Sequence, residues 1–177
     1  METKKQFYPI KFTPIPSRRP WGGDSLIKVL GKSFVETDED GNEVHLTTDV
    51  RIGESWEVAD MGAQESVVEG GWLSGNTLEE LMETYLDRIV GEHVFEWYGL
   101  QFPLLIKFLD INDKLSVQVH PDDDYALVHE KQYGKNEMWY VVDALPGAGI
   151  YCGFKQDVTE EQVEECLAFD EKAGAGE

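Results

Sequence analysis

The spacing of apolar residues predicts one amphipathic helix. Between Leu78 and Val90 the apolar side chains recur three and four residues apart, which places them on one face of an α-helix. Thr77 and Glu80 form a capping box before this stretch, and Gly91 follows it. We expect the apolar face to pack in a core rather than to form a groove for a partner.

Alternating or continuous apolar positions predict strands in five further segments of the chain. The expected strands are residues 7–15, 52–58, 102–110, 114–120 and 137–143. Two prolines confine the segment 7–15 to an edge strand or extended arm. The continuous apolar run of the segment 102–110 is typical of a strand buried on both faces. Asp40-Gly41 signals a hairpin between two apolar segments.

These patterns predict a mainly β fold with a helical insertion around residues 77–91. Short helices are also expected after residue 122, from Asp123 to about Lys131, and after residue 159, where Thr159 and Gln162 repeat the capping-box pattern. A length of 177 residues permits one domain with a hydrophobic core.

The charge of the chain argues against polyanionic partners. Fifteen Lys and Arg residues against 35 Asp and Glu give a net charge of −20, which repels nucleic acid and anionic membrane surfaces. No apolar run approaches the roughly 18 residues that span a bilayer, and the N-terminus lacks a signal-peptide pattern. The isolated Cys152 and Cys166 favour reduced thiols, so we expect a cytoplasmic protein without nucleic-acid or membrane binding.

Lys107 is the one charged residue within the apolar run 102–109. A lysine is almost never fully buried without a partner. Its ammonium group is therefore expected either to reach solvent along the apolar surface or to face a polar site, and the sequence favours neither alternative.

The segment 114–120 carries the strongest sign of chemistry. As a strand it would place Ser116, Gln118 and His120 together on one face. Such a polar face is also typical of the solvated side of a sheet. If the strand 137–143 lies beside it, Glu137 can approach Gln118 and His120, and an imidazole, a carboxylate and an amide oxygen together form a donor set that zinc accepts. The remaining charge on the site would be positive and would attract an anionic sugar.

Four motifs in this order resemble one known family. They are Arg19-Pro-Trp-Gly-Gly, Ile52-Gly-Glu-Ser-Trp-Glu, the long run from Phe102 to Asp123, and Gly134-Lys-Asn-Glu-Met-Trp-Tyr-Val. From about Phe7 to Phe154 the chain resembles the type I mannose-6-phosphate isomerases, zinc enzymes of the cupin superfamily, and in particular their short bacterial form. The resemblance implies a cupin-type jelly roll, here incomplete. Residues 1–155 would be the N-terminal catalytic portion and residues 156–177 an acidic helix and tail.

The resemblance also implies which residues carry the function. Gln118, His120 and Glu137 match the family's zinc ligands, and Lys135 matches its lysine proposed to take part in catalysis. The positions that match residues lining the substrate pocket are Trp21, Glu54, Lys107 and Ser116. The implied function is zinc-dependent interconversion of mannose 6-phosphate and fructose 6-phosphate, with a phosphorylated hexose as substrate.

Two alternatives stay open beside this prediction. The family's last zinc-binding histidine and a later catalytic arginine have no counterpart in the 177 residues. The chain is therefore also consistent with an inactive cupin fragment that binds metal weakly, self-associates or is completed by a second polypeptide. An iron-dependent cupin oxygenase is the third reading, but it would need a His-x-His or His-x-Asp pair, and Gln118-Val-His120 argues against it.

Overall fold

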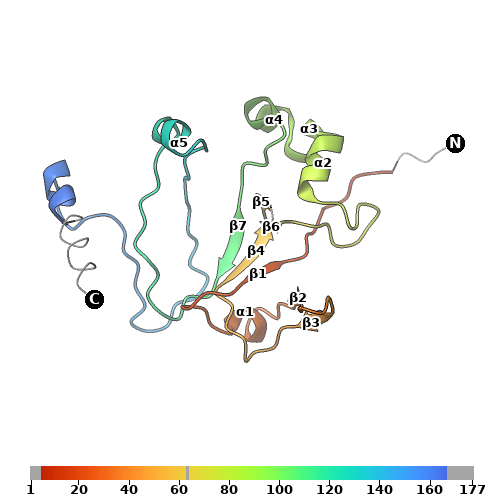
Figure 1. Ribbon diagram of the computed structural model, residues 1–177, viewed down its shortest axis with the longest axis horizontal. Coiled ribbons are helices and arrows are strands. Elements are labelled where there is room, and N and C mark those ends of the chain that lie inside the picture. The colour runs from red at the N-terminus through yellow and green to blue at the C-terminus, as the bar shows by residue number, and fades with distance from the viewer. Residues whose placement is uncertain (1–4, 63, 167–177) are drawn as a thin grey trace. The chain divides into compact units, whose positions relative to one another are not determined.

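The computed structural model describes residues 5–62 and 64–166. The chain divides into two units, Met1–Leu115 and Ser116–Glu177. All strands and four of the labelled helices belong to the first unit, and α5 belongs to the second (Figure 1). No helix in the described residues is long and apolar enough to cross a membrane.

The labelled elements are short. The helices are α1 (Ser25–Lys28), α2 (Leu78–Tyr85), α3 (Asp87–Val90), α4 (Glu92–Tyr98) and α5 (Asp123–His129). The strands are β1 (Ile15–Ser17), β2 (Val35–Thr37), β3 (Glu43–His45), β4 (Glu54–Val58), β5 (Asp60–Met61), β6 (Gln64–Glu65) and β7 (Ile106–Leu109). Strands combined with helices therefore form the fold, as the sequence predicts.

A three-stranded antiparallel sheet organises the first unit. β4 lies between β1 and β7, with Ile15 opposite Trp56 and Trp56 opposite Lys107 (Figure 1). Because alternate side chains on a strand share a face, Glu54 and Trp56 point to the same side of β4. This register fixes the relative positions of Glu54, Trp56 and Lys107.

The predicted hairpin at Asp40-Gly41 is confirmed. β2 pairs with β3 on either side of it, and Gly41 has a φ of +85°, a conformation that glycine adopts without strain. The Asp38 carboxylate accepts hydrogen bonds from the backbone N–H groups of Asp40 and Asn42. These bonds hold the turn in place, as is common for Asp at the start of a tight turn.

Two hydrophobic clusters form the core of the first unit. The first consists of Leu26, Phe34, Leu46 and Ile52. The second consists of Val68, Leu73 and Leu81, with aromatic residues of the N-terminal arm and of α2 packed around it. The apolar face of α2 is therefore core, as its spacing predicts. Among the described residues of the second unit, Ala126 is the buried hydrophobic side chain.

The helix predicted from Leu78 to Val90 is interrupted. Thr77 and Glu80 form the expected capping box, with Glu80 N donating to Thr77 Oγ1 at 3.1 Å. The prediction of one continuous helix is wrong, because Leu86 has a φ of +53° and separates α2 from α3. Leu86 is 39% exposed, so it does not continue the buried stripe.

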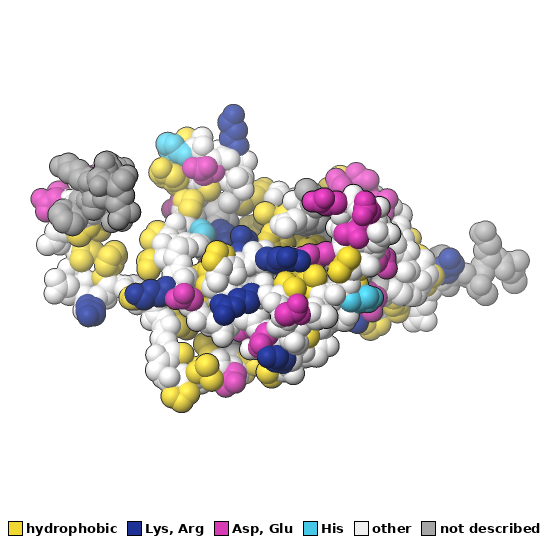
Figure 2. All heavy atoms as spheres, turned by 60° about the horizontal axis from the view of Figure 1, so that its bottom comes forward, with side chains coloured by type: hydrophobic (Ala, Val, Ile, Leu, Met, Phe, Trp, Pro, Cys, Tyr) yellow, Lys and Arg dark blue, Asp and Glu magenta, His cyan; other side chains and the backbone are white. Residues whose placement is uncertain are grey.

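The strands predicted from residue 102 onward are shorter or absent. β7 covers four residues at the edge of the sheet, and its Ile106 is 47% exposed, so the prediction of burial on both faces is wrong. Residues 114–120 and 137–143 are not strands. A period-two pattern decides which side chains share a face, but a strand also needs a hydrogen-bonded neighbour. Apolar side chains of both segments are exposed. On the face of the molecule drawn in Figure 2, hydrophobic side chains are visible at the surface.

Both helices predicted in the second unit begin where expected. α5 starts at Asp123, and Asp122 caps it by accepting a hydrogen bond from Tyr125 N at 2.9 Å. Residues 160–166 are helical, and Thr159 N donates to Gln162 Oε1 at 3.0 Å, which confirms the second capping box. The rest of the predicted acidic helix and tail, residues 167–177, lies outside the described residues.

Leu81→Ala is expected to lower the free energy of unfolding by about 2–5 kcal/mol, because Leu81 is fully buried and the substitution leaves a cavity. Urea denaturation followed by circular dichroism measures the change. Leu100→Ala is the matched control. Because Leu100 is 50% exposed, this substitution should lower the free energy of unfolding much less. Equal losses in the two variants would contradict the assignment of Leu81 to the core.

Candidate active site

Three side chains of the first unit meet around the Glu54 carboxylate. Trp56 Nε1 donates to Glu54 Oε2 at 2.6 Å, and Lys107 Nζ donates to the same oxygen at 3.2 Å. Arg19 Nε lies 3.4 Å from Glu54 Oε1. We call Arg19, Glu54, Trp56 and Lys107 the Glu54 cluster. Two cations share one carboxylate in it, so it carries a net positive charge within an acidic chain.

Lys107 faces polar partners instead of open solvent. Besides its bond to Glu54, its Nζ lies 4.5 Å from the centroid of the Trp56 ring, within the range of a cation–π interaction. Trp56 stands opposite Lys107 in the β4–β7 register, so the sheet itself creates this contact. Of the two alternatives that the sequence leaves open, the polar site is confirmed.

Glu54 is ionised in this setting. Glu54 is 7% exposed, and burial opposes the charge of its carboxylate. The hydrogen bond from Trp56 and the positive charges of Lys107 and Arg19 outweigh that cost, so the pKa of Glu54 lies below its usual value. The cluster therefore presents a buried carboxylate with its donors already in place.

Two glycines allow the Arg19–Trp21 segment to lie against β4. A Cβ added to Gly53 would lie 2.6 Å from Arg19 Cβ and 2.8 Å from Trp21 Cζ3, and a Cβ added to Gly22 would lie 2.5 Å from Gly53 N. Neither position tolerates a side chain without a shift of the backbone. This close approach places the predicted pocket residue Trp21 beside Gly53, which precedes Glu54.

Glu54→Gln is expected to destabilise the chain at neutral pH and to do so less in acid. Because the folded-state pKa is lowered, the carboxylate contributes its full stability above the usual value of 4.5, and this contribution is lost as the pH falls through the folded value. Urea midpoints of the wild type and the variant at neutral pH and at steps below 4.5 measure the difference. Glu83→Gln, at an exposed position of α2, is the control. A difference for Glu54→Gln that does not change with pH would contradict this account.

A second set of predicted site residues meets in the second unit. His120 Nε2 lies 3.4 Å from Glu137 Oε1, and Lys135 Nζ lies 2.7 Å from the same oxygen. We call His120, Lys135 and Glu137 the His120 cluster. The hydrogen bond from Lys135 lowers the pKa of Glu137 below its usual value, although partial burial acts in the opposite direction.

The chain returning after α5 creates the His120 cluster. Gly134 N donates to Asp123 Oδ1 at 2.8 Å. A Cβ added to Gly134 would lie 2.6 Å from the carbonyl carbon of Asp122, so the backbones touch there. These contacts hold residues 135–137 beside His120. The sequence predicts the proximity of His120 and Glu137, but a helix and its return segment produce it, not two paired strands.

The His120 cluster has features that fit a metal. His120 Nε2 is buried and has no hydrogen-bond partner, although it lies 3.4 Å from Glu137 Oε1. A buried imidazole nitrogen without a partner, next to an ionised carboxylate, provides two of the donor types that zinc accepts. The described residues contain no group of three or more His, Cys, Asp and Glu side chains that could hold an ion.

Ser116 and Gln118 pair with each other. Gln118 Nε2 donates to Ser116 Oγ at 2.7 Å, and both residues are exposed. This bond uses the amide nitrogen of Gln118, not the oxygen that would bind a metal. The described contacts do not join either residue to His120 or Glu137.

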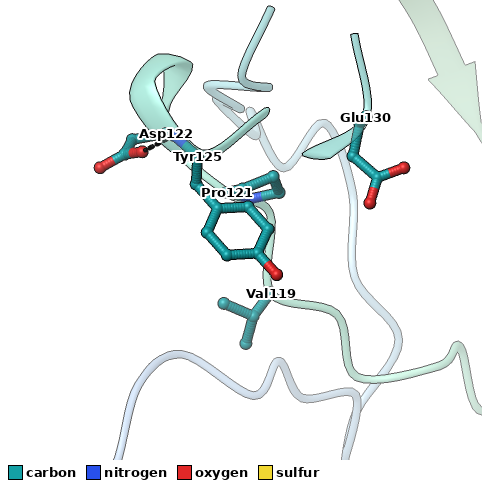
Figure 3. A pocket seen from close by; sticks show the side chains of 5 residues that line it. All are labelled: Val119, Pro121, Asp122, Tyr125 and Glu130. Carbon is teal, nitrogen blue, oxygen red and sulfur yellow. Dashed lines mark hydrogen bonds between the residues drawn. The ribbon is translucent and has the colours of Figure 1, made fainter. Parts of the chain in front are cut away.

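An open pocket of about 480 Å³ lies beside α5. It is lined by Val119, Pro121, Asp122, Tyr125 and Glu130, none of which is a predicted site residue. In Figure 3 the Tyr125 ring lies over Val119 and Pro121, and the carboxylates of Asp122 and Glu130 lie on opposite sides. Asp122 already caps α5, so this pocket does not gather the groups that carry chemistry.

Sequence reasoning missed Arg19 and Trp56 as site residues. Trp56 follows Glu54 by two residues in a predicted strand, so the spacing alone places both on one face. Arg19 belongs to the motif that contains Trp21, but its contact with Glu54 depends on the close approach at Gly53. The other histidines, His45, His93 and His129, are exposed.

Comparison with known proteins identifies the family. Residues 11–156 match the family described as phosphomannose isomerase type I, catalytic domain. The chain is 37% identical over 155 residues to mannose-6-phosphate isomerase ManA of Bacillus subtilis, covering 86% of this chain and 43% of that protein. It is 38% identical over 144 residues to a mannose-6-phosphate isomerase of Streptococcus mutans, covering 81% and 40%.

A solved structure agrees with these similarities. The crystal structure of the mannose 6-phosphate isomerase from Bacillus subtilis superimposes with a TM-score of 0.55 at 33% identity, covering 71% of this chain and 35% of that one. The chain thus spans less than half the length of the relatives it matches. On the match of residues 11–156 to the model of its catalytic domain, the chain belongs to the type I phosphomannose isomerase family.

Proposed function

We propose that the chain carries the zinc-binding part of an aldose–ketose isomerase that interconverts mannose 6-phosphate and fructose 6-phosphate. The observation that supports this most strongly is the His120 cluster, in which a buried imidazole nitrogen without a hydrogen bond faces an ionised carboxylate. The family of the chain and the names of its relatives, mannose-6-phosphate isomerases, point to the same chemistry.

Gln118, His120 and Glu137 are the residues that would hold the metal. Zinc bound there would supply a Lewis acid that polarises the sugar oxygens. Glu137 is held in its ionised form by Lys135, which suits it to bind a cation. His120 presents an Nε2 atom that no hydrogen bond occupies. Gln118 would contribute its amide oxygen, since the amide nitrogen is engaged by Ser116.

Lys135 is proposed to supply a proton or a positive charge to the sugar oxygens. Isomerisation moves a proton between C1 and C2 of the sugar, and a positioned acid or base lowers the barrier to that transfer. Lys135 Nζ lies 2.7 Å from Glu137 Oε1, so its ammonium group is anchored next to the proposed metal ligands. From there it can give a proton to a sugar oxygen or stabilise the negative charge that develops on that oxygen.

Trp21, Glu54, Lys107 and Ser116 are the proposed substrate contacts. The Glu54 carboxylate can accept hydrogen bonds from sugar hydroxyls, and the Lys107 ammonium and Ser116 hydroxyl can donate to sugar or phosphate oxygens. The net positive charge of the Glu54 cluster favours an anionic sugar, although the chain as a whole carries −20. Trp21 would form an apolar wall.

We further propose that residues 1–155 belong to a cupin-type jelly roll and that residues 156–177 lie outside the catalytic portion. The antiparallel β1–β4–β7 sheet and the superposition on the Bacillus subtilis isomerase support the first statement. The end of the family match at residue 156 supports the second. A cytoplasmic location stays a prediction from the sequence.

A second candidate is that this polypeptide binds metal weakly and requires another polypeptide, or a second copy, for turnover. The His120 cluster favours it, because the described residues hold no group of three or more ionisable metal ligands. A further ligand would then come from the partner. Tightly bound zinc together with turnover by the purified chain would exclude this candidate.

The proposed function is tested by incubating the purified chain with zinc and mannose 6-phosphate and measuring fructose 6-phosphate. We expect formation of fructose 6-phosphate that a chelator abolishes and that added zinc restores. Unphosphorylated mannose is the control for recognition of the phosphate. Zinc-loaded chain without turnover would favour the second candidate, and a chain that neither binds zinc nor turns over substrate would contradict both.

A further inference from the structure

Trp56 connects the two charged side chains that we propose to contact substrate. Its indole N–H donates to Glu54 Oε2 at 2.6 Å, and its ring lies 4.5 Å from the Lys107 ammonium. Trp56 is 7% exposed, so these contacts are shielded from water and are correspondingly strong. One rigid side chain thus contacts both the carboxylate and the cation.

The nearby residues Lys32, Glu57 and Phe108 form a similar group that can be compared with the Glu54 cluster. Lys32 Nζ lies 4.7 Å from the centroid of the Phe108 ring and 2.7 Å from Glu57 Oε1, so an aromatic ring, a lysine and a glutamate again meet. Phenylalanine has no polar hydrogen, so Glu57 receives its hydrogen bonds from the Lys32 ammonium and from the Ser55 hydroxyl. At Glu54 one side chain, Trp56, supplies both the neutral donor to the carboxylate and the ring that contacts the lysine.

We propose that Trp56 is a positioning residue, which acts on phosphorylated-sugar binding by fixing Glu54 and Lys107 in one preset geometry. The inference rests on the proposed function. The Lys107 ammonium has three N–H donors and uses one of them on Glu54 Oε2, so it keeps N–H groups for a ligand oxygen. Holding a long lysine side chain over the ring before binding also reduces the rotamer entropy that binding would otherwise cost.

The first test is spectroscopic and needs no change at Trp56. In the ¹⁵N-labelled chain, the Trp56 indole N–H signal should lie downfield, as expected for a short hydrogen bond to a carboxylate, and should move upfield in Glu54→Gln. Addition of fructose 6-phosphate should move the same signal in the wild type. Trp97, which is 68% exposed on α4, provides the control signal, which should stay in place in both experiments.

The second test is a double-mutant cycle on fructose 6-phosphate affinity measured by calorimetry. Trp56→Phe keeps the ring and removes the N–H, so we expect affinity to fall about tenfold, the loss of one hydrogen bond to a charged group. In the Glu54→Gln background the same change should cost at most about twofold, because the partner has already been altered. Trp97→Phe should leave affinity unchanged.

These experiments separate failure of the inference from failure of the proposed function. An indole signal that ignores Glu54→Gln, or additive losses in the cycle, would overturn the positioning role of Trp56. If Trp56→Phe does not fold, the wild-type and Glu54→Gln spectra still decide between the outcomes. Wild-type chain that binds no fructose 6-phosphate, although its indole signal responds to Glu54→Gln, would overturn the proposed function and the substrate role derived from it.

Discussion

His120→Ala is expected to lower zinc affinity by about 100-fold or more. Even substitutions of residues that only orient a metal ligand commonly cost 10- to 100-fold, and His120 would be a ligand itself. The substitution removes the buried Nε2 that faces Glu137 and leaves a carboxylate without its imidazole neighbour. Zinc titration against a competing chelator measures the affinity, and turnover of mannose 6-phosphate should fall with it.

The matched control for this prediction is His93→Ala. His93 is exposed at the start of α4, so its loss removes the same chemical group without touching the His120 cluster. We expect wild-type zinc affinity in this control. If the two variants hold zinc equally well, the metal is bound elsewhere and the proposed ligand set is wrong.

Lys135→Met is expected to lower kcat by about 10²- to 10⁴-fold, the range typical of a lost general acid or base. Methionine keeps much of the length of the side chain and removes the charged nitrogen that lies 2.7 Å from Glu137. Because Lys135 is not a proposed metal ligand, zinc content should stay close to that of the wild type. Steady-state kinetics on zinc-loaded protein, with metal content measured on the same sample, check both expectations.

Lys114→Met is the control for Lys135→Met, because Lys114 is exposed and lies outside both clusters. Its kcat should match the wild type. A Lys135→Met variant that loses activity only in proportion to lost zinc would show that Lys135 supports the metal site and does not carry the proton. Unchanged kcat would remove Lys135 from the chemistry altogether.

The features that local chemistry determines were predictable from the sequence. The capping box at Thr77, the start of α5 at Asp123 and the turn at Gly41 each depend on side chains within a few residues of one another. The apolar spacing of α2 likewise predicted which of its residues enter the core, including Leu81.

Features that depend on distant contacts were not predictable. The positive φ of Leu86 breaks a helix whose spacing continues without interruption. α4 carries no buried residue, so it lacks the pattern that would reveal it. Residues 114–120 and 137–143 have the alternation of strands but form none, because alternation does not specify a pairing partner.

The candidate site shows the same division. The sequence correctly brought His120 and Glu137 together, although through paired strands that the structure lacks. The sequence did not decide whether Lys107 reaches solvent or faces a polar site. The β4–β7 register decides it, because it places Trp56 opposite Lys107. The contact of Arg19 with Glu54 depends on two backbone segments that only glycine allows to meet, which no local pattern encodes.

The proposed isomerase site is tested most directly by measuring the formation of fructose 6-phosphate from mannose 6-phosphate. Wild type and His120→Ala are prepared side by side with equimolar zinc. We predict product in the wild type in proportion to bound zinc, and about 100-fold less zinc affinity with a matching loss of product in the variant. Wild-type chain that binds zinc through His120 and forms no product would contradict the proposed activity of this polypeptide. Equal turnover in both proteins would contradict the proposed site.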